Sequence, residues 1–437
     1  MAGAESAAER GILGNRAFLA IWGAQILSQV GANAIVSALI VLVAELTRSN
    51  TSSSILILLA IVPAVLFGIV AGVIVDRTDR KRVLVITNAL RAAAVVPLLV
   101  AGQSVAAAYV VNFFVAAITT FFVPAESAML PAIVRRRDLM VANSLFTFTF
   151  NGAFLVGFII LAPVVIALAG FEVLFFVVAL MFAAAALLCL TLPAPAPPVA
   201  GPIGVAVASE AVARTSQSVR EALQYLRTAP VVTWALVYIA LTYTLVAVAG
   251  ALAPGFLREV LGVGERNVVI LVAPAGIGVI AGLGMLHLIG ARISRPQAIA
   301  AGLVATAISL LGLAAARPAT SLFRRAASPE LGEAFPFFVA VVAVTTFAFG
   351  VAYAFITVPS MTMLQEQLHD AIRGRIFGVL NMLVSVFSFL PLLIVGPVAD
   401  IWGVAPVFVG AAVIVGLVWR GGRATRLRAA VDSATGA

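Results

Sequence analysis

The chain has 437 residues, 63% of them hydrophobic and only 10% charged, and its mean hydropathy is +1.15. Water-soluble globular domains are much less apolar, so this composition excludes that class. A formal net charge of +9 would raise the question of nucleic acid in a soluble protein, but basic loops on one side of a membrane explain it here. With one cysteine, Cys189, and two histidines, His287 and His369, the sequence offers neither a disulfide framework nor a zinc site.

Long apolar runs follow one another from end to end of the chain. A hydrocarbon layer of about 30 Å takes roughly 20 apolar residues per helical crossing. Runs of this length without polar alternation predict helices and exclude a β-barrel, because backbone groups in lipid must pair within the segment. The first run is too long for a signal peptide, so we expect a retained helix. The twelve predicted helices span residues 17–46, 52–75, 83–101, 105–125, 141–169, 172–193, 231–257, 267–289, 297–316, 336–360, 375–397 and 401–420.

A linker separates the sixth and seventh predicted helices. It begins with four prolines between Pro193 and Pro198 and then becomes rich in Gly, Ser and Ala, a composition typical of a connecting segment. Ser218–Arg227 mixes apolar and charged residues, which fits a short helix on the membrane surface or simply the start of the seventh helix. The predicted domains are 1–193, an N-terminal six-helix bundle; 194–228, a cytoplasmic linker; and 229–437, a C-terminal six-helix bundle with a short basic tail.

Arginine and lysine resist translocation, and in this topology they concentrate in alternate loops. The basic segments are the two termini, the linker and the loops that follow the second, fourth, eighth and tenth helices. This distribution places both termini in the cytoplasm. It predicts a multi-pass protein of the cytoplasmic (inner) membrane.

The two halves of the chain repeat each other. The second and eighth helices each carry a proline and a GxxxG spacing, which lets helix backbones approach closely, and a basic loop follows both. These residues are Pro63, Gly68 and Gly72 in the first half and Pro274, Gly278 and Gly282 in the second. The fourth and tenth helices are each predicted to end at a proline, Pro124 and Pro359 respectively. Two similar bundles joined by a cytoplasmic linker suit a transporter that alternates access between the two sides.

The loop between the second and third helices is the most specific local signal. It reads Gly72-Val-Ile-Val-Asp76-Arg77-Thr78-Asp79-Arg80-Lys81-Arg82. This resembles the G-x-x-x-D-R-x-G-R-R loop of the major facilitator superfamily, with Asp79 where glycine is usual. The Asp-Arg-x-Asp-Arg-Arg form, together with Arg91 and the segment from Pro124 to Leu145, resembles the branch around the enterobactin exporter and the macrolide-efflux proteins.

The resemblance implies the major facilitator fold: an all-α membrane protein with twelve transmembrane helices in two pseudo-symmetric six-helix bundles. It also implies that the loop aspartate faces the cytoplasmic start of the eleventh helix in one conformation. A carboxylate at a helix N-terminus is favourable by about 0.3–1 kcal/mol, which biases two conformations of similar energy. We therefore expect a conformational latch made of Asp76, Arg77, Arg80, Lys81, Arg373 and Arg375.

Signals of proton coupling are weak. Residues 105–125 lack the arginine that proton-coupled drug exporters of the superfamily often carry in the fourth helix, and the fifth helix matches their glycine-proline pattern only loosely. The acids closest to membrane depth lie near predicted helix ends, where we interpret them as interfacial charges and assign no proton carrier. These acids are Glu45, Glu126, Glu172 and Asp400.

In the fold that the resemblance implies, the first, fourth, seventh and tenth helices line a central cavity, and each carries polar or aromatic residues at helical spacing. The substrate-cavity candidates are Gln25, Gln29, Asn33, Tyr109, Asn112, Trp234, Tyr238, Thr242, Phe349, Tyr353 and Thr357. Hydrogen bonding between helices explains each amide or hydroxyl equally well, and packing explains each ring. Together, however, an uncharged polar and aromatic lining favours a bulky amphipathic organic substrate.

No phosphate-binding loop or catalytic constellation stands out, so we expect neither an ATP-driven pump nor an enzyme, and no cofactor or metal. The resemblance implies a secondary active exporter of a drug-like compound, siderophore or other amphipathic metabolite. We expect a monomer in the lipid bilayer with no nucleic-acid partner. Two alternatives stay open: a lysophospholipid or other lipid translocator, and a membrane sensor or scaffold that transports nothing.

Overall fold

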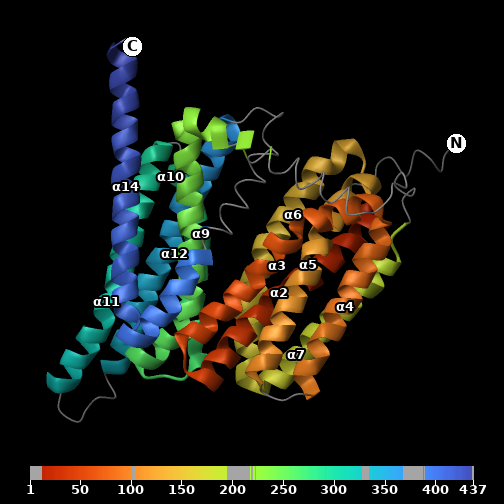
Figure 1. The fold of residues 1–437 in the computed structure, drawn as a ribbon, viewed down its shortest axis with the longest axis horizontal. Coiled ribbons are helices and arrows are strands. Elements are labelled where there is room, and N and C mark those ends of the chain that lie inside the picture. The colour runs from red at the N-terminus through yellow and green to blue at the C-terminus, as the bar shows by residue number, and fades with distance from the viewer. Residues whose placement is uncertain are drawn as a thin grey trace. The chain divides into compact units, whose positions relative to one another are not determined.

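The structure is a computed structural model of the 437-residue chain. It describes residues 12–100, 104–193, 217, 220, 221, 223–290, 292–326, 334–367, 387 and 389–435. Every regular element within these residues is a helix, which confirms the predicted all-α class (Figure 1). The described residues group into two compact units. One unit holds those of Met1–Leu46 and Leu59–Thr215, and the other holds those of Thr47–Leu58 and Ser216–Ala437.

The helices from the first half of the chain are predominantly apolar segments. They are α2 (Arg16–Thr47), α3 (Asn50–Arg77), α4 (Arg80–Val100), α5 (Val105–Ile133), α6 (Leu139–Phe154) and α7 (Ala162–Leu190), with the π-helical η3 (Leu155–Leu161) joining α6 to α7. Within α7 the chain turns at Gly170, whose φ of 85° lies in the left-handed region that glycine adopts without a steric penalty. The predicted fifth and sixth helices therefore meet at Gly170.

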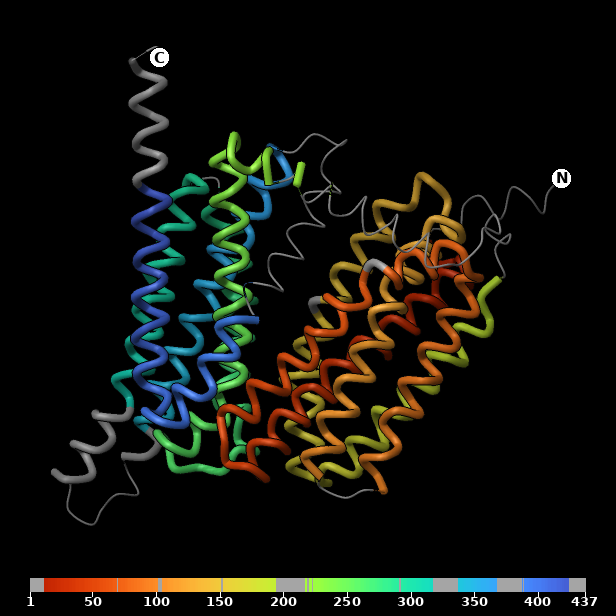
Figure 2. Tube along the Cα trace, viewed as in Figure 1, coloured from red at the N-terminus to blue at the C-terminus, as the bar shows by residue number. Residues whose placement is uncertain are grey.

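The second half of the chain contains a similar series. It comprises α9 (Pro230–Phe256) with the π-helical η4 (Leu257–Leu261), the short η5 (Glu265–Val268), α10 (Val269–Ile289), α11 (Arg295–Ala326), α12 (Ala334–Gln367) and α14 (Val404–Thr435). A further apolar helix, Phe389–Trp402, precedes α14. Helix α12 packs against α9, α10 and α11, while α14 packs against α9 and α11; the tube in Figure 2 traces these helices.

Ten helical stretches in the described residues are long and apolar enough to cross a membrane. One of them, Arg136–Leu190, has 55 residues and turns at Gly170, so it supplies two crossings. Phe389–Trp402 falls in the eleventh predicted helix, which is only partly described. The chain is therefore a multi-pass membrane protein, and its helices agree with the series predicted from the apolar runs.

Two helices continue through prolines that were predicted to end them. Helix α5 passes Pro124 and reaches Ile133, and α12 passes Pro359 and reaches Gln367. Proline is tolerated inside membrane helices because neighbouring groups satisfy the freed backbone carbonyl. As a consequence, residues that follow these prolines are helical and not part of loops.

Glycines in the second unit allow two helix backbones to touch. A Cβ atom at Gly278 would overlap with the backbone of Phe347, and one at Gly350 would overlap with the carbonyl oxygen of Ala275. The GxxxG spacing of the eighth helix thus brings α10 against α12. At the matching glycines of the second helix, Gly68 and Gly72, an added Cβ atom would have no described neighbour within 4 Å, so the expected close contact is absent among the described residues.

Helix α3 belongs to both units. Its residues up to Leu58 group with the second unit, and those from Leu59 group with the first. The helix is continuous over this boundary, and Pro63 lies inside it one turn later.

Candidate functional site

The turn between α3 and α4 is organised by Asp79. One carboxylate oxygen of Asp79 accepts the backbone N–H of Lys81 at 2.9 Å, and the other lies 3.5 Å from Nε of Arg82. Aspartate is among the best residues for capping a helix N-terminus, because its side chain satisfies a backbone N–H that has no partner in the helix. The acid that replaces the usual glycine of this loop therefore caps α4.

Arg80 ties the start of α4 to α5. Its Nη1 donates a hydrogen bond of 3.1 Å to the backbone carbonyl oxygen of Ala128. Asp76, in the last turn of α3, is exposed, whereas Arg77 and Lys81 are half-buried. Four of the six predicted latch residues thus lie at the facing ends of α3 and α4.

The other two predicted latch residues, Arg373 and Arg375, lie outside the described residues. The latch therefore stays a prediction.

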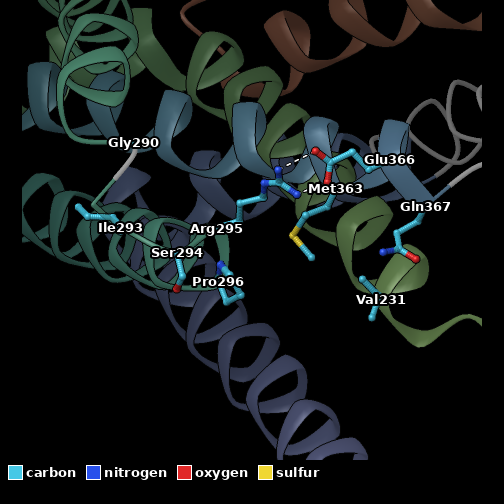
Figure 3. Close-up of a pocket in the computed structure, with 9 residues that line it drawn as sticks. All are labelled: Val231, Gly290, Ile293, Ser294, Arg295, Pro296, Met363, Glu366 and Gln367. Atoms are coloured by element: carbon cyan, nitrogen blue, oxygen red, sulfur yellow. Dashed lines mark hydrogen bonds and ion pairs between the residues drawn. The ribbon is translucent and has the colours of Figure 1, made fainter.

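The equivalent turn of the second half, between α10 and α11, carries an ion pair. Arg295, the first residue of α11, donates through both terminal nitrogens to the carboxylate of Glu366 near the end of α12, and the Nη2–Oε1 distance is 2.6 Å. Figure 3 shows this pair at a hollow lined by the starts of α9 and α11 and the ends of α10 and α12. The volume of the hollow is about 450 Å³. Arg80 and Arg295 occupy matching places, since each begins a helix and bonds to the C-terminal part of the next one.

Sequence reasoning missed Glu366, because the tenth helix was predicted to end at residue 360. Once the helix is extended past Pro359, Glu366 lies in its last turn, where it meets the basic turn before α11. In the sequence, Glu366 could have been selected only as an acid that lies a few residues beyond a predicted helix end.

Asp400 holds the other end of α3, within the second unit. Its carboxylate accepts the hydroxyl of Ser49 at 2.6 Å and the backbone N–H groups of Asn50 and Thr51 at 2.6 and 3.0 Å. Glu259 of η4 accepts Nδ2 of Asn50 at 3.4 Å and the first backbone N–H of α14 at 3.3 Å. Asp400 is therefore more than an interfacial charge: it caps a helix that begins about 350 residues earlier in the chain.

The candidates on α2 and α5 lie mainly between helices. Gln25 is 3% exposed and donates to a backbone carbonyl of α6 at 3.3 Å, while Asn33 donates to the backbone carbonyl of Gln29 at 2.8 Å. Asn112 is 3% exposed and Tyr109 is half-buried. Gln25 and Asn33 thus use at least part of their hydrogen-bonding capacity within the first unit.

Two of the candidates on α9, Trp234 and Tyr238, face α14. The rings of Trp234 and Tyr238 lie 5.8 Å apart, and Cβ atoms at Gly421 and Gly422 would overlap with these two rings. Thr242 donates its hydroxyl to the carbonyl of Tyr238 at 2.7 Å. The structure therefore places the two aromatic candidates against a neighbouring helix of the same unit.

The candidates on α12 meet a tyrosine that sequence reasoning missed. Phe349, Tyr353 and Thr357 are half-buried, and the ring of Tyr353 lies 6.3 Å from that of Tyr243 on α9. Tyr243 follows Tyr238 by five residues, which rotates it by about 140° around the helix. It therefore falls outside the stripe that periodicity selected on the seventh helix.

Glu126 has a different environment from the other acids near membrane depth. Glu172 is exposed beside the Gly170 turn, and Glu45 lies in the last turn of α2. Glu126 is only 5% exposed, lies inside α5 and interacts electrostatically with Arg91 of α4. Because α5 runs on to Ile133, Glu126 is buried inside the helix and does not follow its end as predicted.

The family model described as Major Facilitator Superfamily matches residues 21–391. The chain belongs to this superfamily. It is accordingly a secondary transporter of a small molecule and not an enzyme, and the residues matched include every described helix from the body of α2 to the start of Phe389–Trp402. No curated protein matches the chain.

Solved structures of major facilitator transporters share the fold. A mutant of the nucleoside transporter NupG superposes with a TM-score of 0.69 at 15% identity, covering 93% of this chain and 99% of that one. A bacterial homologue of the human lysosomal transporter Spinster gives 0.62 at 15% identity, with 96% of each chain covered. The POT family transporter PepTSo gives 0.65 at 14% identity, covering 94% of this chain and 98% of that one. Similarity at this level of identity shows the fold alone.

Proposed function

We propose that this major facilitator protein is an exporter that moves a bulky amphipathic organic molecule, such as a drug-like compound or a siderophore, out of the cell by alternating access. The domain division 1–193 and 229–437, with a cytoplasmic linker, belongs to the same proposal. In it, the basic turns at Arg80 and Arg295 lie on the cytoplasmic side.

The observation that carries the substrate class is the contact between Tyr243 of α9 and Tyr353 of α12, whose ring centroids lie 6.3 Å apart. Phe349 and Thr357 share a face of α12 with Tyr353, because they lie one turn to either side of it. The surface formed by Tyr243, Phe349, Tyr353 and Thr357 consists of aromatic rings and hydroxyl groups and bears no charge. Such a surface binds rings and apolar groups with a few oriented hydrogen bonds, which suits an amphipathic organic molecule.

The direction of transport rests on the resemblance of the loop from Gly72 to Arg82 to that of the exporters. The proposed latch supports alternating access between two conformations. Asp76 is exposed at the end of α3 and does not cap α4, because Asp79 does so. A carboxylate in this position is available to a helix N-terminus or an arginine in one conformation only.

Efflux from energised vesicles tests the proposal. A panel of fluorescent amphipathic compounds, siderophores and one nucleoside is measured with and without an uncoupler. We expect at least one amphipathic compound to be exported, with export lost in Tyr353→Ala and in Asp76→Asn. Tyr225→Ala is the matched control, because Tyr225 lies in the helical segment before α9 and should leave export unchanged.

Two outcomes would overturn parts of this proposal. Export of the nucleoside alone would contradict the amphipathic substrate class. Movement of lysophospholipid between the leaflets, with no movement of the panel compounds, would favour the lipid translocator instead.

A further inference from the structure

Two ionisable side chains are buried together in the first unit. Arg91 of α4 is 1% exposed and Glu126 of α5 is 5% exposed, and the Arg91 guanidinium lies over the ring of Phe122, one helical turn before Glu126 on α5. Burying charge inside a membrane protein is costly, so such groups persist mainly where they serve transport. The pair is not needed to cap a helix or to close a turn, since both residues lie well inside their helices.

The surroundings of Arg91 hold its positive charge in place. The guanidinium carbon lies 4.2 Å from the ring centre of Phe122 and 4.9 Å from that of Phe182, a double cation–π contact. Its Nη2 donates to Oδ1 of Asn88 at 2.7 Å, and the same oxygen accepts the hydroxyl of Ser28 at 2.7 Å. Aromatic faces and an oriented amide stabilise a cation, so Arg91 acts as a fixed counter-charge.

Each of the two side chains also has one buried atom without a hydrogen-bond partner among the described residues, Nε in Arg91 and Oε1 in Glu126. An ionised carboxylate can accept at both oxygens, and an oxygen without a donor loses the solvation that water would provide. The positive charge of Arg91 therefore stabilises the charged form of Glu126, whereas the apolar surroundings favour its protonated form. Opposing effects on the two forms are the condition for a group that takes up and releases a proton.

The other groups around this pair are neutral. Among the described residues, Cys189 of α7 is the further titratable group that interacts with Glu126, and it accepts a hydrogen bond from Nδ2 of Asn88 at 3.7 Å. Helix α2 contributes the hydroxyl of Ser28. The described contacts therefore leave Arg91 as the fixed charge opposite Glu126.

We propose that Glu126 is a proton-binding site through which this transporter couples to a proton gradient, an inference that rests on the proposed transport function for its physiological role. The Glu126 carboxylate takes one proton from the aqueous phase on one side and becomes a neutral carboxyl group. It returns that proton to the other side after the conformational change, and the Arg91 guanidinium keeps its charge throughout. Phe122 and Phe182 position Arg91 and do not take part in proton transfer.

Infrared difference spectroscopy of the purified full-length protein tests the site without knowledge of the substrate. Titration between acidic and alkaline buffer should show the C=O band of a buried protonated carboxyl group. We expect this band to disappear in Glu126→Gln and to remain in Glu172→Gln, which makes the same chemical change at an exposed acid. A band that persists unchanged in a folded Glu126→Gln protein would overturn the proposal.

A second variant covers the case in which Glu126→Gln does not fold. Glu126→Asp keeps a carboxyl group but withdraws it by one methylene from Arg91, so the band should shift in frequency and in titration midpoint. An unshifted band in Glu126→Asp would again assign the signal to another residue.

Transport assays separate this proposal from the proposed function. Glu126→Gln should lose gradient-driven efflux while it retains exchange of labelled for unlabelled substrate, since exchange needs no net proton movement. If no compound moves in the wild-type protein but the band still depends on Glu126, the proton site stands and the export proposal fails. If efflux is unaffected in Glu126→Gln, the coupling role is refuted.

Discussion

The carboxylate of Asp400 accepts a hydrogen bond of 2.6 Å from the backbone N–H of Asn50, the first residue of α3. The same carboxylate also receives the N–H of Thr51 and the hydroxyl of Ser49. An anion at this place satisfies backbone donors that have no partner in the helix and meets the positive end of the helix dipole. Asp400 therefore holds the start of α3 within the second unit through three hydrogen bonds.

Replacing Asp400 with alanine should loosen the first turn of α3. Loss of a capping carboxylate costs about 1 kcal/mol, which corresponds to roughly fivefold more frequent opening of the capped turn. Amide hydrogen exchange of a peptide covering residues 49–56 in detergent micelles measures this change. The expected result is faster exchange there, with no change in α12.

Asp138→Ala is the matched control for this experiment. Asp138 precedes α6 but makes no capping hydrogen bond through its side chain. Its replacement should leave exchange at residues 49–56 unaltered. Equal exchange at residues 49–56 in wild type and Asp400→Ala would show that Asp400 does not hold this turn.

Asp79 should tolerate glycine better than alanine. Both replacements remove the hydrogen bond from the N–H of Lys81, but glycine leaves the N-cap backbone open to water and adapts to its geometry. The expected loss of stability is about 1 kcal/mol for Asp79→Ala and a few tenths for Asp79→Gly. Thermal unfolding of the purified variants ranks them by stability. An alanine variant at least as stable as the glycine variant would show that Asp79 does not cap α4.

Gly350 should not accept a side chain. A Cβ atom there would overlap with the carbonyl oxygen of Ala275, so Gly350→Ala should separate α10 from α12 and cost about 1–3 kcal/mol. Gly284→Ala is the control, because nothing described lies within 4 Å of its added methyl group. We expect a clear drop in melting temperature for the first variant only. Equal melting temperatures would mean that the two backbones are not in contact.

The Arg295–Glu366 ion pair should contribute little to stability. Its side chains are 46% and 48% exposed, and exposed pairs are worth about 0.2–1 kcal/mol. A double-mutant cycle with Arg295→Gln and Glu366→Gln measures the coupling energy, which should fall towards zero in high salt because exposed charges are screened. A coupling that is large and independent of salt would show that the pair is buried in the membrane-embedded protein.

The proposed orientation is tested by labelling single cysteines. Cys189 is buried and is replaced by alanine, and cysteine is then introduced at Arg136 or at Gly264, which are both exposed. In intact cells a membrane-impermeant maleimide should react at position 264 and not at position 136. The reverse pattern would invert the topology and place the basic turns outside.

The helices were predictable because bilayer thickness sets the length of an apolar run, and this requirement acts on each segment separately. Helix ends at proline were not predictable in the same way. Pro124 and Pro359 look like terminators in sequence, yet the membrane interior tolerates them, and so Glu126 and Glu366 were placed outside their helices.

The contacts of the candidate site depend on information that periodicity does not contain. A stripe such as Trp234 and Tyr238 defines one face of a helix, but only packing decides that this face meets α14. The capping of Asn50 by Asp400 joins residues 350 positions apart, and neither residue type signals the other. Asp79, in contrast, acts on its own helix, so its role follows from local sequence alone.

The proline in α3 gives this helix a preferred point of bending. Pro63 has no backbone N–H, so the carbonyl group of Leu59 loses the partner that it would have in an uninterrupted helix. Leu59 is also the first residue of α3 that groups with the first unit, while Leu58 groups with the second. The turn from Leu59 to Pro63 is therefore the part of α3 that bends at the lowest energetic cost.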